Sequence, residues 1–297
     1  MFSIIFTAIL GTAVGYLLRR FRGLQRINVS ITLTICLMLF FLGVSVGENR
    51  LLMKNFWSFG LQAALIAGLG LAGSVLAAWA LERWFSERRT EMRNSLLVVG
   101  AFVAGCLFGW LVGGLEQVHN WTLYLLYALM FQIGVSVGCS DNLGEIIRTF
   151  RPKMLLIPLA TVGGTLLFSA LAALCLAKWR VTECLAVGSG MGYYSLSSII
   201  ITQLKSASLG TQVAAELGII ALLSNVFREL SALLLAPWIR RHFGRLAPIS
   251  AAGVASVDVV LPTIIRVSGK QMISISLFHG MLIDMSVPVL VPFFCSL

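Results

Sequence analysis

The stretch GIIALLSNVFRELSALLLAPW, residues 218–238, has the length of a membrane span but carries two ionisable residues near its centre. Burying Arg228 or Glu229 in the middle of a membrane helix costs about 3 kcal/mol each on insertion scales, and such residues normally face a bundle interior or a water-filled path. Asn225 and Glu229 are four positions apart, so a helix places both on one face. The stretch therefore predicts a transporter with Glu229 beside its polar path.

Composition predicts an all-α polytopic membrane protein. The chain has 297 residues, of which 58% are hydrophobic and 11% are charged, whereas soluble domains carry about 25% charged residues. Residues 2–18 lack both a basic region before the apolar core and a cleavage site, so we expect a retained first span rather than a signal peptide. The net charge of +10 comes from basic residues beside the spans, which indicates membrane topology and not nucleic-acid binding.

No sequence motif predicts enzyme chemistry. The chain contains no P-loop, no GxSxG turn and no HExxH pattern, so we expect no enzyme activity. Its six cysteines have neither CxxC nor His-paired spacing, and we expect them to be small buried side chains. We therefore expect no disulfide framework, no metal and no cofactor.

The basic residues predict how the first six spans are oriented. The apolar spans cover residues 2–18, 27–47, 56–81, 95–115, 121–138 and 154–177. Loops after the odd-numbered spans carry 11 Lys and Arg residues, against 4 after the even-numbered spans. Cytoplasmic loops are enriched in these residues, so the odd loops are predicted to be cytoplasmic and the N-terminus outside.

Two later segments are predicted to be broken. Glu183–Gln203 is rich in glycine and serine, and residues 249–266 contain both glycine and proline. If each segment enters and leaves on one side, the basic loop around residues 240–245 stays cytoplasmic; such a backbone is tolerated where protein or a water-lined cavity satisfies it. A last span follows at 272–294. The expected fold has about eight transmembrane helices, two opposed re-entrant or discontinuous segments, and both termini outside.

Internal repeats support this topology. The pentapeptide GVSVG occurs at 43–47 and 134–138, and each copy is preceded by a GxxxG motif, at 11–15 and 105–109. The repeat unit holds an odd number of spans, so its copies have opposite orientations, as in many secondary transporters. We expect a single membrane transporter domain over residues 1–297, with inverted halves at about 1–81 and 95–177. The broken-segment core covers about 183–297.

The broken segments supply most candidate binding residues. A fainter repeat relates Gly192, Ser195 and Ser197 to Gly253, Ser256 and Asp258. Beside unwound backbone, the Asp258 carboxylate suits a cation; the alternative is an N-cap for a half-helix starting near Val259. The opposing wall is predicted to consist of Ser195, Ser197 and Ser198 with Tyr193 and Tyr194, unless the serine hydroxyls bond back to their own helix. Glu229 is predicted to be a cation or proton site, the alternative being an ion-pair partner.

Three further acidic residues and one histidine lie near the predicted path. Glu48 and Asp141 each follow a GVSVG copy and are predicted to lie on opposite sides of the membrane. A carboxylate at each side would draw in or release a cation; the alternative is a helix end that meets water. Asp284 lies in the middle of the last span and is a candidate proton-relay group. His279 points about 140° away from Asp284 around an ideal helix, so we expect a packing residue rather than a dyad.

At these residues the chain resembles the bacterial lysine exporter family of the LysO type. The resemblance runs through GVSVGEN (43–49), MGYYSLSS (191–198), FREL (227–230), SAAGVASVDVVLP (250–262) and FHGMLIDMSVPVLVPFF (278–294). It implies export of L-lysine and its analogue thialysine across the bacterial inner membrane by proton antiport. It also implies important intramembrane acidic residues, here Glu48 and Glu229.

The candidate residues and the family resemblance indicate the same mechanism. Glu229 and Asp258 would hold an amino group of lysine, and a half-helix N-terminus near Gly192 or Gly253 would take its carboxylate. The expected partners are lysine, protons and lipid, with self-association into a homo-oligomer left open. Alternatives are a sodium–proton antiporter, an exporter of another small metabolite, or a membrane protein without transport activity.

Overall fold

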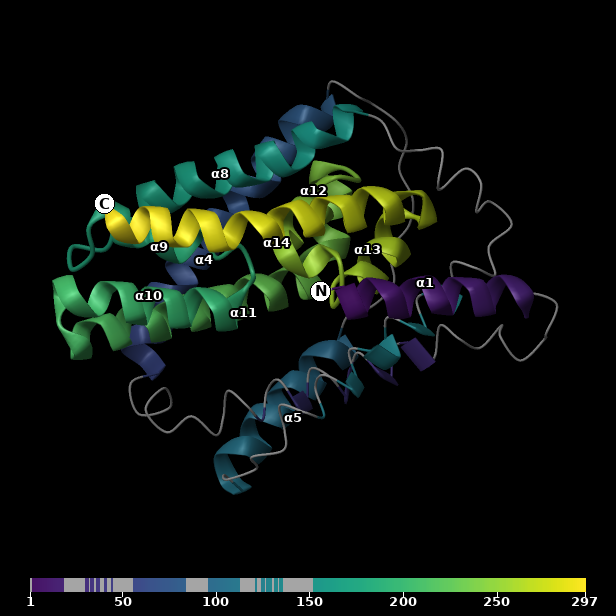
Figure 1. Ribbon diagram of the computed structural model, residues 1–297, viewed down its shortest axis with the longest axis horizontal. Helices are drawn as coiled ribbons and strands as arrows, with labels where there is room; N and C mark the ends of the chain where they lie inside the picture. The colour runs from purple at the N-terminus through teal and green to yellow at the C-terminus, as the bar shows by residue number, and fades with distance from the viewer. Residues whose placement is uncertain are drawn as a thin grey trace. The chain divides into compact units, whose positions relative to one another are not determined.

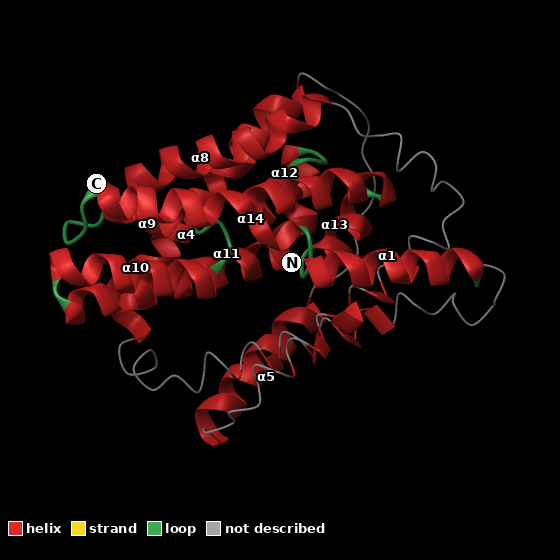
Figure 2. Cartoon of the chain, in the orientation of Figure 1, coloured by secondary structure: helices red, strands yellow, loops and turns green. Residues whose placement is uncertain are grey.

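The computed structural model describes the following residues: 2–18, 56–83, 96–112 and 152–297, with 30, 31, 33, 34, 36, 37, 40, 41, 44, 121, 124, 125, 127–129, 131, 132, 134 and 135. These residues form α-helices, short 3-10 helices and turns, and none of them is in a strand (Figure 2). The predicted all-α class is therefore confirmed for the described part of the chain.

The chain divides by its contacts into two compact units. Unit 1 comprises Met1–Lys54 and Arg93–Thr149, and unit 2 comprises Asn55–Met92 and Phe150–Leu297. Each predicted repeat half is thereby split in the same way. Its first two spans belong to unit 1, whereas its third span joins the broken segments in unit 2.

Unit 1 is held together by reciprocal contacts between glycines and backbone. It contains α1 (Phe2–Leu17) and α5 (Leu96–Val112). A Cβ atom added to any glycine of the two GxxxG motifs would overlap a carbonyl oxygen of the partner segment. The pairs are Gly11 with Phe131, Gly15 with Val135, Gly105 with Phe40, and Gly109 with Val44. The GxxxG motif of each half therefore packs against the second span of the other half. At both contacts the two segments run parallel.

Unit 2 contains three helices that are long and apolar enough to cross a membrane, at Trp57–Arg83, Thr211–Phe243 and Lys270–Ser296. Its elements are α4 (Phe56–Arg83), η2 (Pro152–Leu155), α8 (Leu156–Ala172), α9 (Val181–Gly188), α10 (Tyr194–Leu209), α11 (Thr211–Phe243), α12 (Ala247–Ala252), η3 (Gly253–Ser256), α13 (Leu261–Ser268), η4 (Lys270–Met272) and α14 (Ile273–Ser296) (Figure 1). The sixth predicted span is shorter than expected, because α8 ends at Ala172.

The third helices of the two halves, α4 and α8, meet at a pair of glycines. A Cβ atom on Gly73 would overlap the carbonyl oxygen of Gly164, and a Cβ atom on Gly164 would overlap that of Gly73. Gly70 lies near Ser169, further along α8, so the two helices are antiparallel. The glycines are 91 residues apart, the same separation as the two GVSVG copies.

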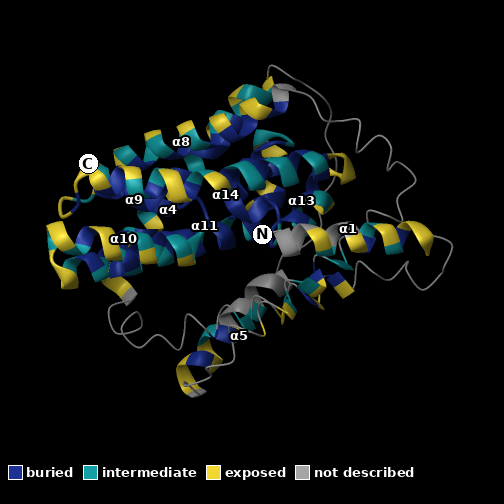
Figure 3. Ribbon diagram, viewed as in Figure 1, coloured by how far each residue is buried: buried dark blue, intermediate teal, exposed yellow. Residues whose placement is uncertain are grey.

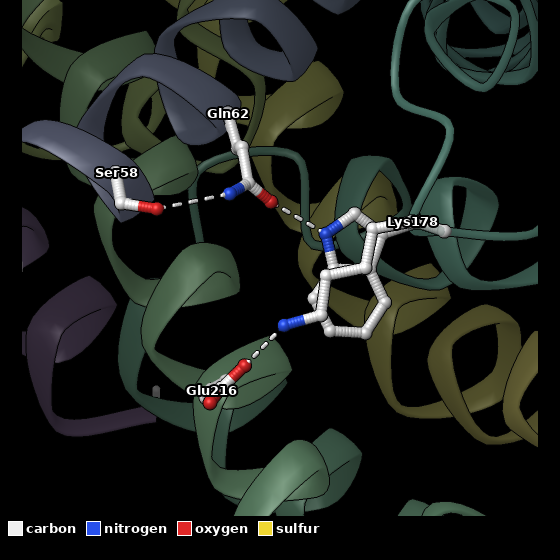
Figure 4. Close-up of polar contacts among 5 residues, drawn as sticks. Ser58, Gln62, Lys178 and Glu216 are labelled. Carbon is white, nitrogen blue, oxygen red and sulfur yellow. Dashed lines mark hydrogen bonds and ion pairs between the residues drawn. The ribbon is translucent and has the colours of Figure 1, made fainter.

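The first broken segment is a helical hairpin whose two ends lie at one end of unit 2. Lys178, in the loop before α9, forms an ion pair with Glu216, which is near the start of α11. The ring nitrogen of Trp179 donates to Gln62 of α4 at 2.6 Å (Figure 4). Since α11 starts two residues after α10 ends, the chain enters through α9 and returns through α10 to the same end (Figure 1).

The second broken segment opens at the other end of unit 2. The Glu82 carboxylate, at the end of α4, accepts hydrogen bonds from the amides of Arg245 (2.6 Å) and Leu246 (2.7 Å), immediately before α12. The chain runs inward through α12, unwinds, and returns through α13 to the start of α14, which contacts η2 beside the start of α8 (Figure 1). The two hairpins therefore open at opposite ends of unit 2.

Helix α11 forms the centre of unit 2. It packs against α10 and α4, and its middle section from Leu223 to Val226 is buried (Figure 3). Large apolar side chains are exposed on several helices of unit 2, including the later part of α11, as is usual for a surface that faces lipid. They include Leu159 and Leu167 on α8, and Val289 and Phe293 on α14.

Candidate functional site

The two broken segments touch each other at their unwound turns. The amide of Val254 donates to the carbonyl oxygen of Met191 at 3.0 Å. Met191 (φ 44°), Gly192 (φ 101°) and Gly253 (φ 60°) adopt left-handed backbone conformations, which only glycine takes without strain. A Cβ atom on Gly253 would also overlap the Met191 carbonyl oxygen. We call residues 189–193 and 253–260 together the crossing.

Asn225 of α11 holds the first break. Its Oδ1 accepts a hydrogen bond from the amide of Gly192 at 2.6 Å, and its Nδ2 donates to Ser197 Oγ at 3.1 Å and to the Ala221 carbonyl oxygen at 2.8 Å. Asn225 is buried, and all of these partners belong to the chain itself. The predicted binding residue thus has a positioning function in this structure.

Arg228, whose role the sequence leaves unexplained, holds the second break. The guanidinium donates to the carbonyl oxygens of Ala251 and Ser250 and to Thr165 Oγ1 of α8, each at 3.1 Å. The first two oxygens belong to the last turn of α12, where helix carbonyls lack intrahelical partners and carry partial negative charge. Arg228 therefore caps the half-helix with a full positive charge.

Glu229, by contrast, has no hydrogen bond or ion pair among the described residues, although its side chain is only 3% exposed. It interacts electrostatically with Asp258, in the unwound turn of the second segment, and Asp258 interacts with Asp284 of α14. We call these three residues the acidic cluster. A buried carboxylate without a partner is costly, so the cluster suits a cation or a proton.

Asp258 is bound by its own turn and is not a helix N-cap. Its Oδ1 accepts from the amide of Val259 at 2.6 Å, whereas α13 begins at Leu261 with Val260 as its N-cap. The alternative considered from the sequence placed the half-helix start two residues too early. One carboxylate oxygen of Asp258 stabilises the unwound backbone, and the side chain is half-buried.

The residues predicted to form the opposing wall differ in where they lie and in what they contact. Tyr194 interacts electrostatically with Glu229 and Asp258, and Tyr193 with Asp258 and Asp284. Ser197 Oγ donates to the Tyr193 carbonyl oxygen at 2.8 Å, as the back-bonding alternative predicts, and also accepts from Asn225. Ser195 is exposed at the start of α10. The two tyrosine hydroxyl groups therefore lie within electrostatic range of the acidic cluster, and Ser197 supports the break.

A buried chain of polar groups fastens the second break to α14 and α8. His279 Nδ1 lies 2.9 Å from Ser256 Oγ, and His279 Nε2 lies 2.9 Å from Thr161 Oγ1. Thr161 also bonds to Ser250 Oγ at 2.8 Å. Ser276 Oγ donates to the Ser256 carbonyl oxygen at 2.7 Å. Both ring nitrogens of His279 are occupied, which agrees with the expected packing role.

Two predicted residues, Glu48 and Asp141, lie outside the described residues. Sequence reasoning missed Thr161, Thr165 and the pair Gly73 and Gly164. An alignment of the two halves at an offset of 91 residues would have found the glycine pair. Among the described residues no group of three or more His, Cys, Asp or Glu side chains could hold a metal ion.

Comparison with known proteins identifies the family. The model of the family described as "Lysine exporter LysO" matches residues 5–98 and 99–295. The chain is 28% identical to "Lysine exporter LysO" of Escherichia coli (strain K12), with 100% of both chains covered. It is 27% identical to a "Putative lysine exporter" of Haemophilus influenzae, covering 67% of this chain and 97% of the relative. No solved structure matches. The chain therefore belongs to the lysine exporter LysO family, a family of membrane transporters.

Proposed function

We propose that this protein exports L-lysine across the bacterial inner membrane in exchange for protons, by alternating access at the crossing. The observation that carries the proposal is Glu229, a buried carboxylate without a partner beside the point where two broken helices meet. The names of the two relatives independently support lysine as the transported molecule. Lysine supplies the compact ammonium group that such a carboxylate requires.

In the proposed cycle, a proton and the ammonium group of lysine compete for Glu229. From the inward-open state, lysine binds to the acidic cluster and displaces a proton. After the site opens outward, protonation of the cluster releases lysine, and the protonated carrier returns. Asn225 and Arg228 keep the two breaks in place, because their hydrogen bonds go to the backbone of the broken segments.

We propose that repeat halves 1–81 and 95–177 are inverted copies within one transporter of about eight spans. Three features support this arrangement: the reciprocal glycine contacts, the antiparallel packing of α4 and α8, and the opposed hairpins. Basic residues of unit 2 gather at the end where α4 and α11 finish, including Arg83, Arg240, Arg241, Arg245, Arg266 and Lys270. This distribution supports a cytoplasmic location for that end and an outside location for both termini.

Glu229→Gln tests the role of Glu229 in proteoliposomes, where a pH gradient drives uptake of labelled lysine. The isosteric amide cannot exchange a proton, so pH-driven lysine flux should be abolished. Glu216→Gln is the matched control, because it makes the same chemical change on the same helix in a partly exposed ion pair. Undiminished pH-driven flux in Glu229→Gln would refute the role of Glu229.

Two further measurements separate this function from its rivals. A bacterium without its lysine exporter should regain growth on thialysine or on lysine-rich dipeptides when it expresses this gene. A sodium–proton antiporter would instead release protons from proteoliposomes when sodium is added without lysine. Sodium-driven proton release together with failed growth rescue would favour that alternative.

A further inference from the structure

Acidic side chains outnumber basic ones around the crossing. Asp258 lies in the unwound turn of the crossing, and it interacts electrostatically with Glu229 on α11 and with Asp284 on α14. Among the described residues that line the crossing, Arg228 is the cation, and it already donates to three oxygen atoms of the protein. A ligand carboxylate would therefore find no uncommitted cation in this part of the structure, whereas ammonium groups would find several acceptors.

We propose that the acidic cluster recognises the two ammonium groups of its ligand rather than the carboxylate, so five-carbon α,ω-diamines are ligands of this site. Lysine carries two ammonium groups on such a chain, and 1,5-diaminopentane is lysine without its carboxylate. The proposal rests on the proposed function for the location of the site. It differs in making the carboxylate dispensable.

The individual groups support this assignment. Glu229 is 3% exposed and has no hydrogen bond or ion pair among the described residues, so a cation would stabilise its ionised form. The Asp258 carboxylate accepts from the amide of Val259 and also interacts with its own backbone amide, but no cation among the described residues pairs with it. The hydroxyl groups of Tyr193 and Tyr194 lie within electrostatic range of these carboxylates, and hydroxyl oxygens accept hydrogen bonds from ammonium groups.

The protein offers fewer groups that could bind the carboxylate of the ligand. The first turn of α10 presents backbone amides to the crossing, but a helix N-terminus carries only about half a positive charge. Arg228 cannot turn towards a ligand carboxylate without leaving the last carbonyls of α12 unpaired. The carboxylate of lysine therefore contributes less to binding than either ammonium group.

A binding series on the purified full-length protein in lipid nanodiscs tests the inference. Calorimetry would compare L-lysine, 1,5-diaminopentane, 6-aminohexanoate and norleucine, which remove one charged group at a time. The dissociation constant of 1,5-diaminopentane should lie within tenfold of that of lysine, and the other two compounds should bind at least thirtyfold more weakly. A 1,5-diaminopentane affinity more than one hundredfold below that of lysine would overturn the inference.

Variants locate the binding and separate this inference from lysine export. Glu229→Gln and Asp258→Asn should each weaken 1,5-diaminopentane binding at least tenfold, and Glu216→Gln should leave it unchanged. Two separate variants are used in case one of them does not fold. Unchanged diamine binding in both folded variants would refute the inference.

Transport measurements distinguish the lysine-export proposal from the diamine inference. If lysine is transported but 1,5-diaminopentane does not compete, the diamine inference fails and lysine export stands. If 1,5-diaminopentane binds in a Glu229-dependent manner but lysine is not transported, lysine export fails and the diamine inference stands. If neither compound binds, both proposals fail.

Discussion

The amide of Gly192 and the side chain of Asn225 are joined by a hydrogen bond of 2.6 Å. This bond attaches the first break to α11, and one turn further along the same helix Arg228 is attached to the second break. A single helix therefore holds both unwound turns, and Glu229 follows directly after these two attachments.

Asn225→Ala should destabilise the protein because it leaves the Gly192 amide without its acceptor and Ser197 without a donor. An unsatisfied buried polar group costs about 1–3 kcal/mol. The apparent melting temperature in detergent should fall, and lysine affinity should fall with it. Gln203→Ala, at an exposed position of α10, is the control and should change neither quantity. An unchanged melting temperature in Asn225→Ala would show that the first break does not depend on this side chain.

Arg228→Ala should be more severe, since it removes a buried charge and leaves two carbonyl oxygens and a hydroxyl without a donor. Each buried acceptor left unsatisfied costs about 1–3 kcal/mol, and this substitution leaves three of them. Arg228→Lys should be intermediate, because lysine keeps the charge but lacks the planar fork that reaches several acceptors. Thermal unfolding measures both variants against Arg241→Ala, an exposed position near the end of α11. Equal stability of Arg228→Ala and Arg241→Ala would contradict the capping role.

The glycine contact between α4 and α8 makes a position-specific prediction. Gly73→Ala and Gly164→Ala place a methyl group against backbone, which should cost about 1–3 kcal/mol. Gly68→Ala and Gly163→Ala lie on the same helices with nothing within 4 Å of an added Cβ atom. These controls should be neutral or more stable by about 0.5–1 kcal/mol, as is usual for alanine in a helix. Thermal unfolding of the four variants measures these effects. The prediction is wrong if the melting temperatures of both pairs change by the same amount.

His279→Gln distinguishes a packing residue from a proton relay. Both ring nitrogens are bound to protein hydroxyl groups, so the substitution should lower stability by about 1–3 kcal/mol. The pH at which lysine flux is half-maximal should remain that of the wild type, because the ring does not take part in proton exchange. Flux measured across a pH series in proteoliposomes gives this midpoint. A displaced midpoint in folded His279→Gln would assign the histidine to the proton path.

Much of unit 2 could be predicted from the sequence because its constraints act on side-chain composition. The glycines near residues 192 and 253 marked the breaks, and the loop charges required hairpins that open at opposite ends. The mid-span position of Glu229 indicated a polar path. Charged groups and unpaired backbone are costly in lipid. These costs restrict where charged residues and glycines occur along the chain, so the sequence shows their effect.

The contacts that hold the crossing together were less predictable. Arg228 binds backbone carbonyl oxygens, and every residue type supplies such an acceptor, so no sequence pattern marks the partner. Ser197 and Asn225 were predicted as ligand groups, but their hydrogen bonds are internal. The length of the unwound turn was also misjudged, because α13 begins at Leu261, two residues later than the start considered from the sequence. Glu48 and Asp141 remain predictions.

The contact between Gly73 and Gly164 has a consequence for how such a chain can arise. When residue i touches residue j as j touches i, the interface has the form found in a symmetric dimer. Here the two partners are the same residue type, and each is covered by the other's backbone. If the two halves are the inverted copies proposed above, this contact lies where two identical three-helix chains would meet on a two-fold axis before their fusion into one gene. A side chain larger than hydrogen would have been excluded from both copies at once.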